Sequence, residues 1–144
     1  MSATTETPEI ISARNGHSQC LLCGTLNPRS LHLTFQASED GGVRTRFKAC
    51  TELQGYDDLL HGGVIASLLD AAMTHCLFYQ GIKAVTGDLH VRFVQPVFCN
   101  ATLELRARIL SSRPPLYRLR AEAVLGERVM AWAEAKFLPC REPR

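Results

Sequence analysis

The stretch HGGVIASLLDAAMTHCLFYQG, residues 61–81, decides the fold of this chain. From Val64 onward its apolar residues recur at helical spacing and share one stripe, formed by Ile65, Leu68, Leu69, Ala72 and Cys76. Gly62 and Gly63 precede this stripe, and Gly81 is a residue type that commonly follows a helix end. The spacing therefore predicts a mostly buried helix that ends near Gly81.

The segments on both sides of this helix show the two-residue alternation of β-strands. Upstream, the pattern predicts a strand from Leu31 and another over 43–53, joined by a tight turn at Asp40-Gly41-Gly42. Downstream it predicts four more strands, over 85–94, 101–110, 116–125 and 128–138. The order β-β-α-β-β-β-β favours an α+β fold, with an antiparallel sheet of about six strands curled around one helix. Such a sheet leaves edge strands open, and dimerisation is a natural way to close them.

The bulk composition favours one globular domain. The 144 residues are 46% hydrophobic and 21% charged, with a formal net charge of +2. Such a small charge argues against a dedicated nucleic-acid binder. We expect a polar, flexible tail over 1–19 and a single domain over 20–144. The tail has no features of a secretory signal, and no apolar run approaches the roughly 20 residues that span a bilayer, so a cytoplasmic protein without membrane contact is expected.

The helix entrance is the first candidate for chemistry. A helix N-terminus carries unpaired N–H groups and a partial positive charge. Because glycine has no side chain, Gly62 and Gly63 would let a substrate carbonyl approach those N–H groups, as in an oxyanion hole for acyl transfer. The alternative is that His61-Gly62-Gly63 only makes a sharp turn.

Asp70 is the second candidate, because a carboxylate inside an apolar helix is costly without a partner or a task. It lies two turns after Gly62, and Thr74 follows on the same face, so the two side chains could bind and activate a water. The alternative is a surface aspartate on an exposed helix side. Gln54 and His61 flank the preceding loop. Gln54 could orient a water or the thioester, and His61 could contact the substrate or hold the loop.

The cysteines give a weaker signal. In a reducing compartment most of the six read as buried thiols. His17-x-x-Cys20-x-x-Cys23 could supply three zinc ligands, but no fourth ligand stands at a familiar spacing. Packing cysteines are the favoured interpretation, and no metal is predicted.

Five arginines gather late in the chain: Arg106, Arg108, Arg113, Arg118 and Arg120. The plain interpretation is a solvated sheet face, since those on strands share the outward phase of a hairpin. The alternative is a phosphate contact for a nucleotide carrier such as coenzyme A, because guanidinium groups hold phosphate well. Arg113 is then the best candidate, as it lies at a turn.

These motifs together resemble the hotdog-fold acyl-CoA thioesterases, and most closely the phenylacetate-pathway (PaaI-like) branch. The resemblance rests on the β-β-α order, on His-Gly-Gly opening the helix, on Asp70, and on Val91-Arg92-Phe93-x-x-Pro96. The lead-in Cys20-x-x-Cys23-Gly24, with Asn27-Pro28, is similar to a bacterial subgroup of that branch. The similarity covers about residues 20–138.

The resemblance implies a hydrolase for a small or medium acyl-CoA, with aromatic acyl groups among the candidates, that needs no cofactor. Gly62 N–H would polarise the thioester carbonyl, and Asp70 would act as general base or nucleophile. Gln54 matches a water-positioning residue, one place away from the commonest spacing. Assisting positions in some members match His61 and Thr74, and in others Thr86, and the two threonines cannot be told apart by sequence.

The resemblance also implies that active sites lie between subunits, with Asp70 facing Gln54 and Gly62 of the partner chain. A homodimer would be the minimal active unit, and a homotetramer is expected. Two alternatives stay open: a hotdog dehydratase, although the chain lacks the hydratase pattern, and a non-catalytic acyl-CoA-binding protein, although nothing resembles a DNA-binding segment.

Overall fold

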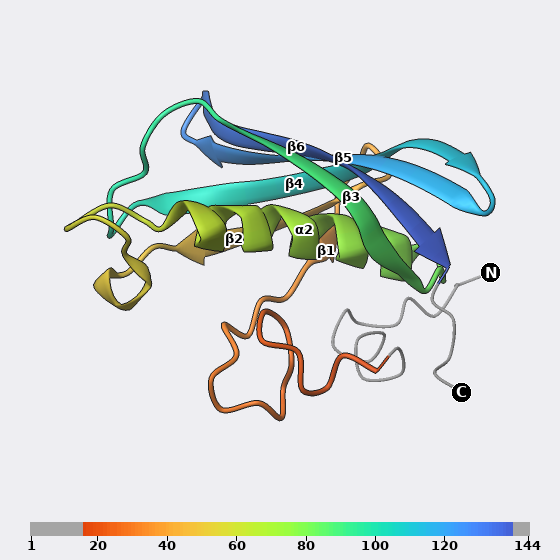
Figure 1. Cartoon of the computed structure of the whole chain (residues 1–144), viewed down its shortest axis with the longest axis horizontal. Helices are drawn as coiled ribbons and strands as arrows, with labels where there is room; N and C mark the ends of the chain where they lie inside the picture. The colour runs from red at the N-terminus through yellow and green to blue at the C-terminus, as the bar shows by residue number, and fades with distance from the viewer. Residues whose placement is uncertain (1–15, 140–144) are drawn as a thin grey trace.

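A computed structural model describes residues 16–139 of the chain (Figure 1). One long helix, α2 (Gly62–Tyr79), follows a short 3-10 helix, η1 (Thr51–Leu53). The strands are β1 (Gln36–Ala37), β2 (Val43–Lys48), β3 (Ala84–Phe93), β4 (Thr102–Arg113), β5 (Leu116–Leu125) and β6 (Arg128–Pro139). The predicted order β-β-α-β-β-β-β is confirmed.

The six strands form one antiparallel sheet in the order β1-β2-β4-β5-β6-β3. Its two faces differ as strict alternation requires. In β5, Tyr117, Leu119, Ala121 and Ala123 are buried, whereas the arginines between them point away from the helix. Strand β3 pairs only with β6, so its other edge is open, and most of its residues are exposed.

Helix α2 lies across the concave face of the sheet, with the lead-in segment (residues 16–35) on its other side (Figure 1). The predicted stripe is confirmed, because Ile65, Leu68, Leu69, Ala72 and Cys76 are all buried. By length and composition alone, α2 is apolar enough to cross a membrane, with a mean hydropathy of 1.2. In this fold 61% of that window is buried, so its apolar surface packs within the protein instead.

The predicted strand from Leu31 is wrong for its first five residues, since strand pairing covers only Gln36–Ala37. Leu31 N–H and Leu33 N–H donate to carbonyls of Leu21 and Leu22 in the lead-in, and His32 between them has φ 52°. Leu33 and Phe35 are nevertheless buried. The alternation therefore predicted the burial of these side chains correctly. The backbone hydrogen bonds of this segment are made with the irregular lead-in and not with a strand.

The predicted 43–53 strand is also too long. Strand β2 ends at Lys48, and η1 takes up residues 51–53. Most of the predicted tail, 1–15, lies outside the described residues. Within the described part, His17 contacts Phe78 of α2 edge-on, with ring centroids 4.8 Å apart. The lead-in therefore reaches the C-terminal half of the helix.

Candidate functional site

The helix entrance is capped by the residue that precedes it. His61 has an extended backbone, and its Nδ1 accepts a hydrogen bond from Gly63 N–H at 2.8 Å. This geometry supports the loop-holding role of His61. It also occupies one of the two glycine N–H groups, so Gly63 N–H is unavailable to a substrate while the cap is closed. Gly62 N–H is left as the candidate donor at the first helical position.

An open groove lies in front of this donor, with a volume of about 790 Å³. Its lining combines the candidates Gln54, His61 and Gly62 with the apolar residues Leu59, Leu60, Ile65, Phe93, Pro96 and Val97. Phe93 lies over Gly62, since a Cβ added at Gly62 would be 3.5 Å from Phe93 Cε1. Three of the residues that the sequence singled out therefore line one cavity.

Gln54 has a local task in this loop. Its Oε1 accepts the N–H of Asp58 at 3.0 Å, where Asp58 has φ 67°. Gln54 also bridges to Leu60 along the backbone. The side-chain oxygen therefore holds the loop, while the amide nitrogen of Gln54 is the group that can face a ligand.

The middle of α2 carries the other candidate set. Asp70 is half-buried, and its Oδ1 accepts a hydrogen bond from the Thr86 hydroxyl of β3 at 2.5 Å. Thr74 donates to the backbone carbonyl of Asp70 at 2.9 Å and does not hold the carboxylate. Of the two threonines that sequence left open, Thr86 is the one on the Asp70 side chain.

The environment of Asp70 shifts its acidity. Burial raises the pKa of the Asp70 carboxyl above its ordinary value, and the Thr86 hydrogen bond and the nearby His17 partly oppose this. A raised pKa brings a carboxylate closer to the basicity that suits a general base. Asp70 lines a second, smaller cavity of about 130 Å³, together with residues of the lead-in and with His75.

Gly62 and Asp70 do not meet within one chain. Eight residues of α-helix span about 12 Å along the axis. The two residues also line different cavities. A thioester whose carbonyl is held at Gly62 is therefore out of reach of the Asp70 of the same chain.

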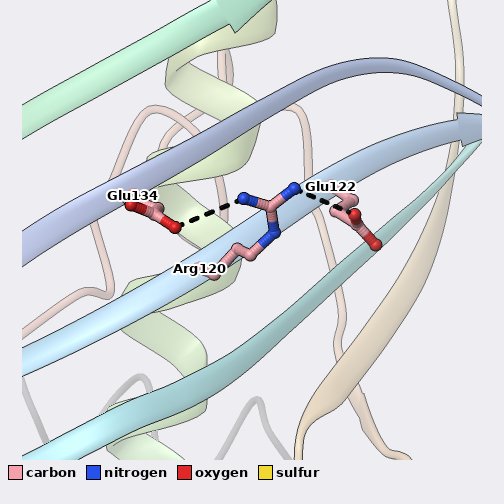
Figure 2. A network of polar contacts seen from close by, with 3 residues as sticks. All are labelled: Arg120, Glu122 and Glu134. Atoms are coloured by element: carbon pink, nitrogen blue, oxygen red, sulfur yellow. Dashed lines mark hydrogen bonds and ion pairs between the residues drawn. The ribbon is translucent and has the colours of Figure 1, made fainter.

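Two of the five arginines form ion pairs on the outer face of the sheet. Figure 2 shows Arg120 between Glu122 and Glu134, each at 3.3 Å. Its guanidinium also lies 4.5 Å from the centre of the Trp132 ring. Arg106 similarly pairs with Glu104 at 3.1 Å. These arrangements support the interpretation as a solvated sheet face.

Arg113, the predicted phosphate contact, is exposed at the end of β4. The β4–β5 turn lies at the end of the sheet away from the start of α2 (Figure 1). Arg113 lines neither the groove nor the Asp70 cavity. Within one chain, the structure does not bring it to the other candidates.

His17 and His75 were not predicted beside Asp70. His75 is a buried polar residue of α2, 4% exposed, and burial lowers the pKa of its imidazole to about 4. Like Asp70, His75 is a polar residue in an apolar helix, so the same feature of the sequence could have revealed it. No sequence feature predicted that His17 lies near Asp70, because this proximity depends on the path of the irregular lead-in.

Comparison with known proteins agrees with this architecture. Residues 58–114 match the family model described as the thioesterase superfamily. The resemblance to the hotdog thioesterases is confirmed. None of the curated proteins compared matches the chain. Similar solved structures include RHA08564, a thioesterase superfamily protein, at 23% identity and a TM-score of 0.75. That match covers 80% of this chain and only 60% of the other.

Two further structures extend the comparison. The E. coli PaaI protein from the phenylacetic acid degradation operon is 18% identical, with a TM-score of 0.74 and coverage of 91% of this chain and 94% of that one. The Bacillus halodurans BH2602 protein, solved with CoA, is 24% identical, with a TM-score of 0.70 and coverage of 78% and 77%. At these identities the likeness shows the fold, which is the hotdog fold.

Proposed function

We propose that this protein is an acyl-CoA thioester hydrolase, acting on a small or medium acyl group, with Asp70 as general base or nucleophile. The observation that carries the proposal is the Asp70 carboxylate, half-buried in an apolar helix and held by Thr86. A position of this kind is costly for folding, so a chemical task is its best explanation. The match of residues 58–114 to the thioesterase superfamily supports the same reaction class.

The groove at the helix entrance supports the substrate half of the proposal. Gly62 N–H would polarise the thioester carbonyl, where charge develops in the transition state. The apolar lining from Leu59 to Val97 suits an acyl group, and Gln54 offers its amide nitrogen beside it. The BH2602 structure holds CoA on a similar fold, which supports a CoA thioester as the substrate here.

We further propose that the active site forms between two copies of the chain. The axial rise of about 12 Å between Gly62 and Asp70 supports a second copy, because neither residue alone completes a hydrolytic site. The open edge of β3 supplies a surface for it, with Val85, Leu89 and Phe93 exposed. Pairing of two such edges would continue the sheet and cover these side chains. A homodimer is then the smallest active unit, and a homotetramer would combine two of them.

The test is thioester hydrolysis across short, medium, long and aromatic acyl-CoAs, read with a thiol-reactive dye. Wild type is compared with Asp70→Asn, and with Glu39→Gln as a matched carboxyl-to-amide change at an exposed turn. Oligomeric state is measured on the same samples by light scattering. We expect turnover of at least one acyl class by wild type and Glu39→Gln, and a large loss in Asp70→Asn at unchanged mass.

The alternatives give different results. Binding of acyl-CoA without hydrolysis by any of the three proteins would contradict the proposal and favour an acyl-CoA-binding protein. Hydration of an enoyl-CoA would favour a dehydratase instead. It would be measured as a loss of the enoyl-CoA ultraviolet absorbance without thiol release.

A further inference from the structure

Three potential metal ligands meet in the lead-in, beside the small cavity that contains Asp70. The ligand atoms of His17, Cys20 and Cys23 all lie within 4.8 Å of one another. The distance from His17 Nδ1 to Cys23 Sγ is 3.5 Å. In tetrahedral zinc sites, with Zn–S near 2.3 Å and Zn–N near 2.1 Å, a nitrogen and a sulfur ligand are about 3.6 Å apart. The observed separation fits that geometry.

The backbone around the two cysteines is shaped to hold their sulfur atoms together. Gly24 N–H donates to the Cys20 carbonyl at 2.8 Å, which closes a tight turn. A Cβ at Gly24 would lie 2.5 Å from Cys20 N, so only glycine fits there. Leu22 N–H also points at Cys20 Sγ, at 3.4 Å.

A fourth donor is available from the helix, although His75 is not among the residues whose ligand atoms lie within 4.8 Å of one another. His75 lines the same cavity as His17, Cys20 and Cys23. His75 is only 4% exposed, and its Nε2 has no hydrogen-bond partner among the described residues. A buried polar atom without a partner carries a desolvation penalty, and coordination would remove it.

We propose that His17, Cys20 and Cys23 bind one divalent ion of the zinc class, and that His75, which lines the same cavity, moves to the ion as the fourth ligand. Two thiolates and two imidazoles form a donor set that Zn²⁺ prefers in structural sites. Binding releases the two thiol protons to solvent. With four protein ligands the ion is structural, and it joins the lead-in to α2.

This site is distinct from the proposed hydrolytic chemistry but adjoins it. Asp70 lines the same cavity, and its carboxylate is already held by Thr86. An ion at the four ligands would therefore fix the lead-in as the wall of the Asp70 cavity, without using Asp70. Metal binding is measured independently of hydrolysis, so the two proposals can fail separately.

The test uses the full chain, expressed with zinc and purified in a reductant that does not chelate metals. Zinc content is measured by inductively coupled plasma mass spectrometry. Metal-free protein is then titrated with Co²⁺, which reports thiolate ligands by charge-transfer absorption and tetrahedral geometry by its visible bands. We expect about one ion per chain and both spectral features.

Variants assign the ligands. Cys20→Ser, Cys23→Ser and His17→Ala should each weaken Co²⁺ binding at least about tenfold, and Cys50→Ser, a cysteine outside the cluster, should not. His75→Gln should reduce the tetrahedral bands while the thiolate absorption remains. Circular dichroism checks the folding of each variant, and His17→Ala serves if a cysteine variant does not fold, since His17 is half-buried.

Three results would overturn the proposal. The first is wild-type protein that retains no stoichiometric zinc and gives no thiolate–Co²⁺ absorption under reducing conditions. The second is unchanged binding in the Cys20→Ser, Cys23→Ser double variant. The third is a wild-type Co²⁺ spectrum in His75→Gln, which would remove His75 from the site.

Discussion

Helix α2 carries two regions that contrast in almost every physical respect. At its start, Gly62 faces a wide, open and largely apolar groove. Two turns later, Asp70 lies in a small cavity among polar and titratable side chains. The start offers an N–H donor and space for a substrate, and the middle offers a base without space for one. This contrast is the reason for proposing that the two regions are halves of one site, completed by a second copy of the chain.

The largest effect is expected from the middle region. Asp70→Asn should lower kcat/KM about 10²- to 10⁴-fold, because the base or nucleophile is lost while shape and the Thr86 contact remain. Its thermal stability at neutral pH should not fall and is expected to rise. A native pKa above the unfolded value gives stability that is present at low pH and lost as pH rises through the native pKa, and the amide removes this loss.

Steady-state kinetics and thermal melts at several pH values check this prediction. A variant that melts well below wild type at neutral pH would show that Asp70 is a structural residue.

The helix start is tested by a pair of substitutions at one position. Gly62→Pro removes the N–H, at the first helical position where proline fits best, after a residue that already has an extended backbone. Gly62→Ala keeps the N–H, and its Cβ would make an ordinary contact with Phe93. We expect Gly62→Pro to lower kcat about 10²- to 10³-fold and Gly62→Ala much less. Equal losses in both variants would mean that space, and not the N–H, is what Gly62 provides.

Mixing the two lesions tests whether the halves meet across subunits. A dimer of one Asp70→Asn chain and one Gly62→Pro chain has one site with both lesions and one intact site. Co-expression of the two inactive variants should therefore recover about a quarter of wild-type activity. About half of the dimers are mixed, and one of the two sites in each mixed dimer is intact. Differently tagged chains allow the mixed dimer to be purified. No recovery in that dimer would contradict a shared site.

The smallest effect is expected at the threonines. In wild type, kcat/KM should rise with pH as Asp70 loses its proton, with an inflection above the ordinary carboxyl pKa. Thr86→Val removes a hydrogen bond that favours the carboxylate, so the inflection should move to higher pH, with a few-fold loss at neutral pH. Thr74→Val is the matched control, since its hydroxyl donates to the backbone. A pH profile that moves only in Thr74→Val would reverse the assignment.

Pattern alone predicted much of the fold and part of the site. The central helix, its buried stripe and the four downstream strands follow from strong periodicity, because alternation and helical spacing are local records of burial. The strand from Leu31 was wrong because its hydrogen bonds go to the lead-in, which alternation does not reveal. Asp70 stood out because it is a charged residue in apolar surroundings, and His75 was missed although the same argument applied.

The sequence by itself determined one buried stripe of α2, where the helix begins and ends to within a few residues, and that Asp70 is chemically unusual. These are properties of spacing and residue type. Only the tertiary structure decided that Thr86 and not Thr74 holds Asp70, that the His61 cap occupies Gly63 N–H, and that His75 lines the same cavity as the histidine and cysteines of the lead-in. Each of these contacts brings together groups whose relative position depends on how the chain folds back in three dimensions, and no sequence spacing encodes it.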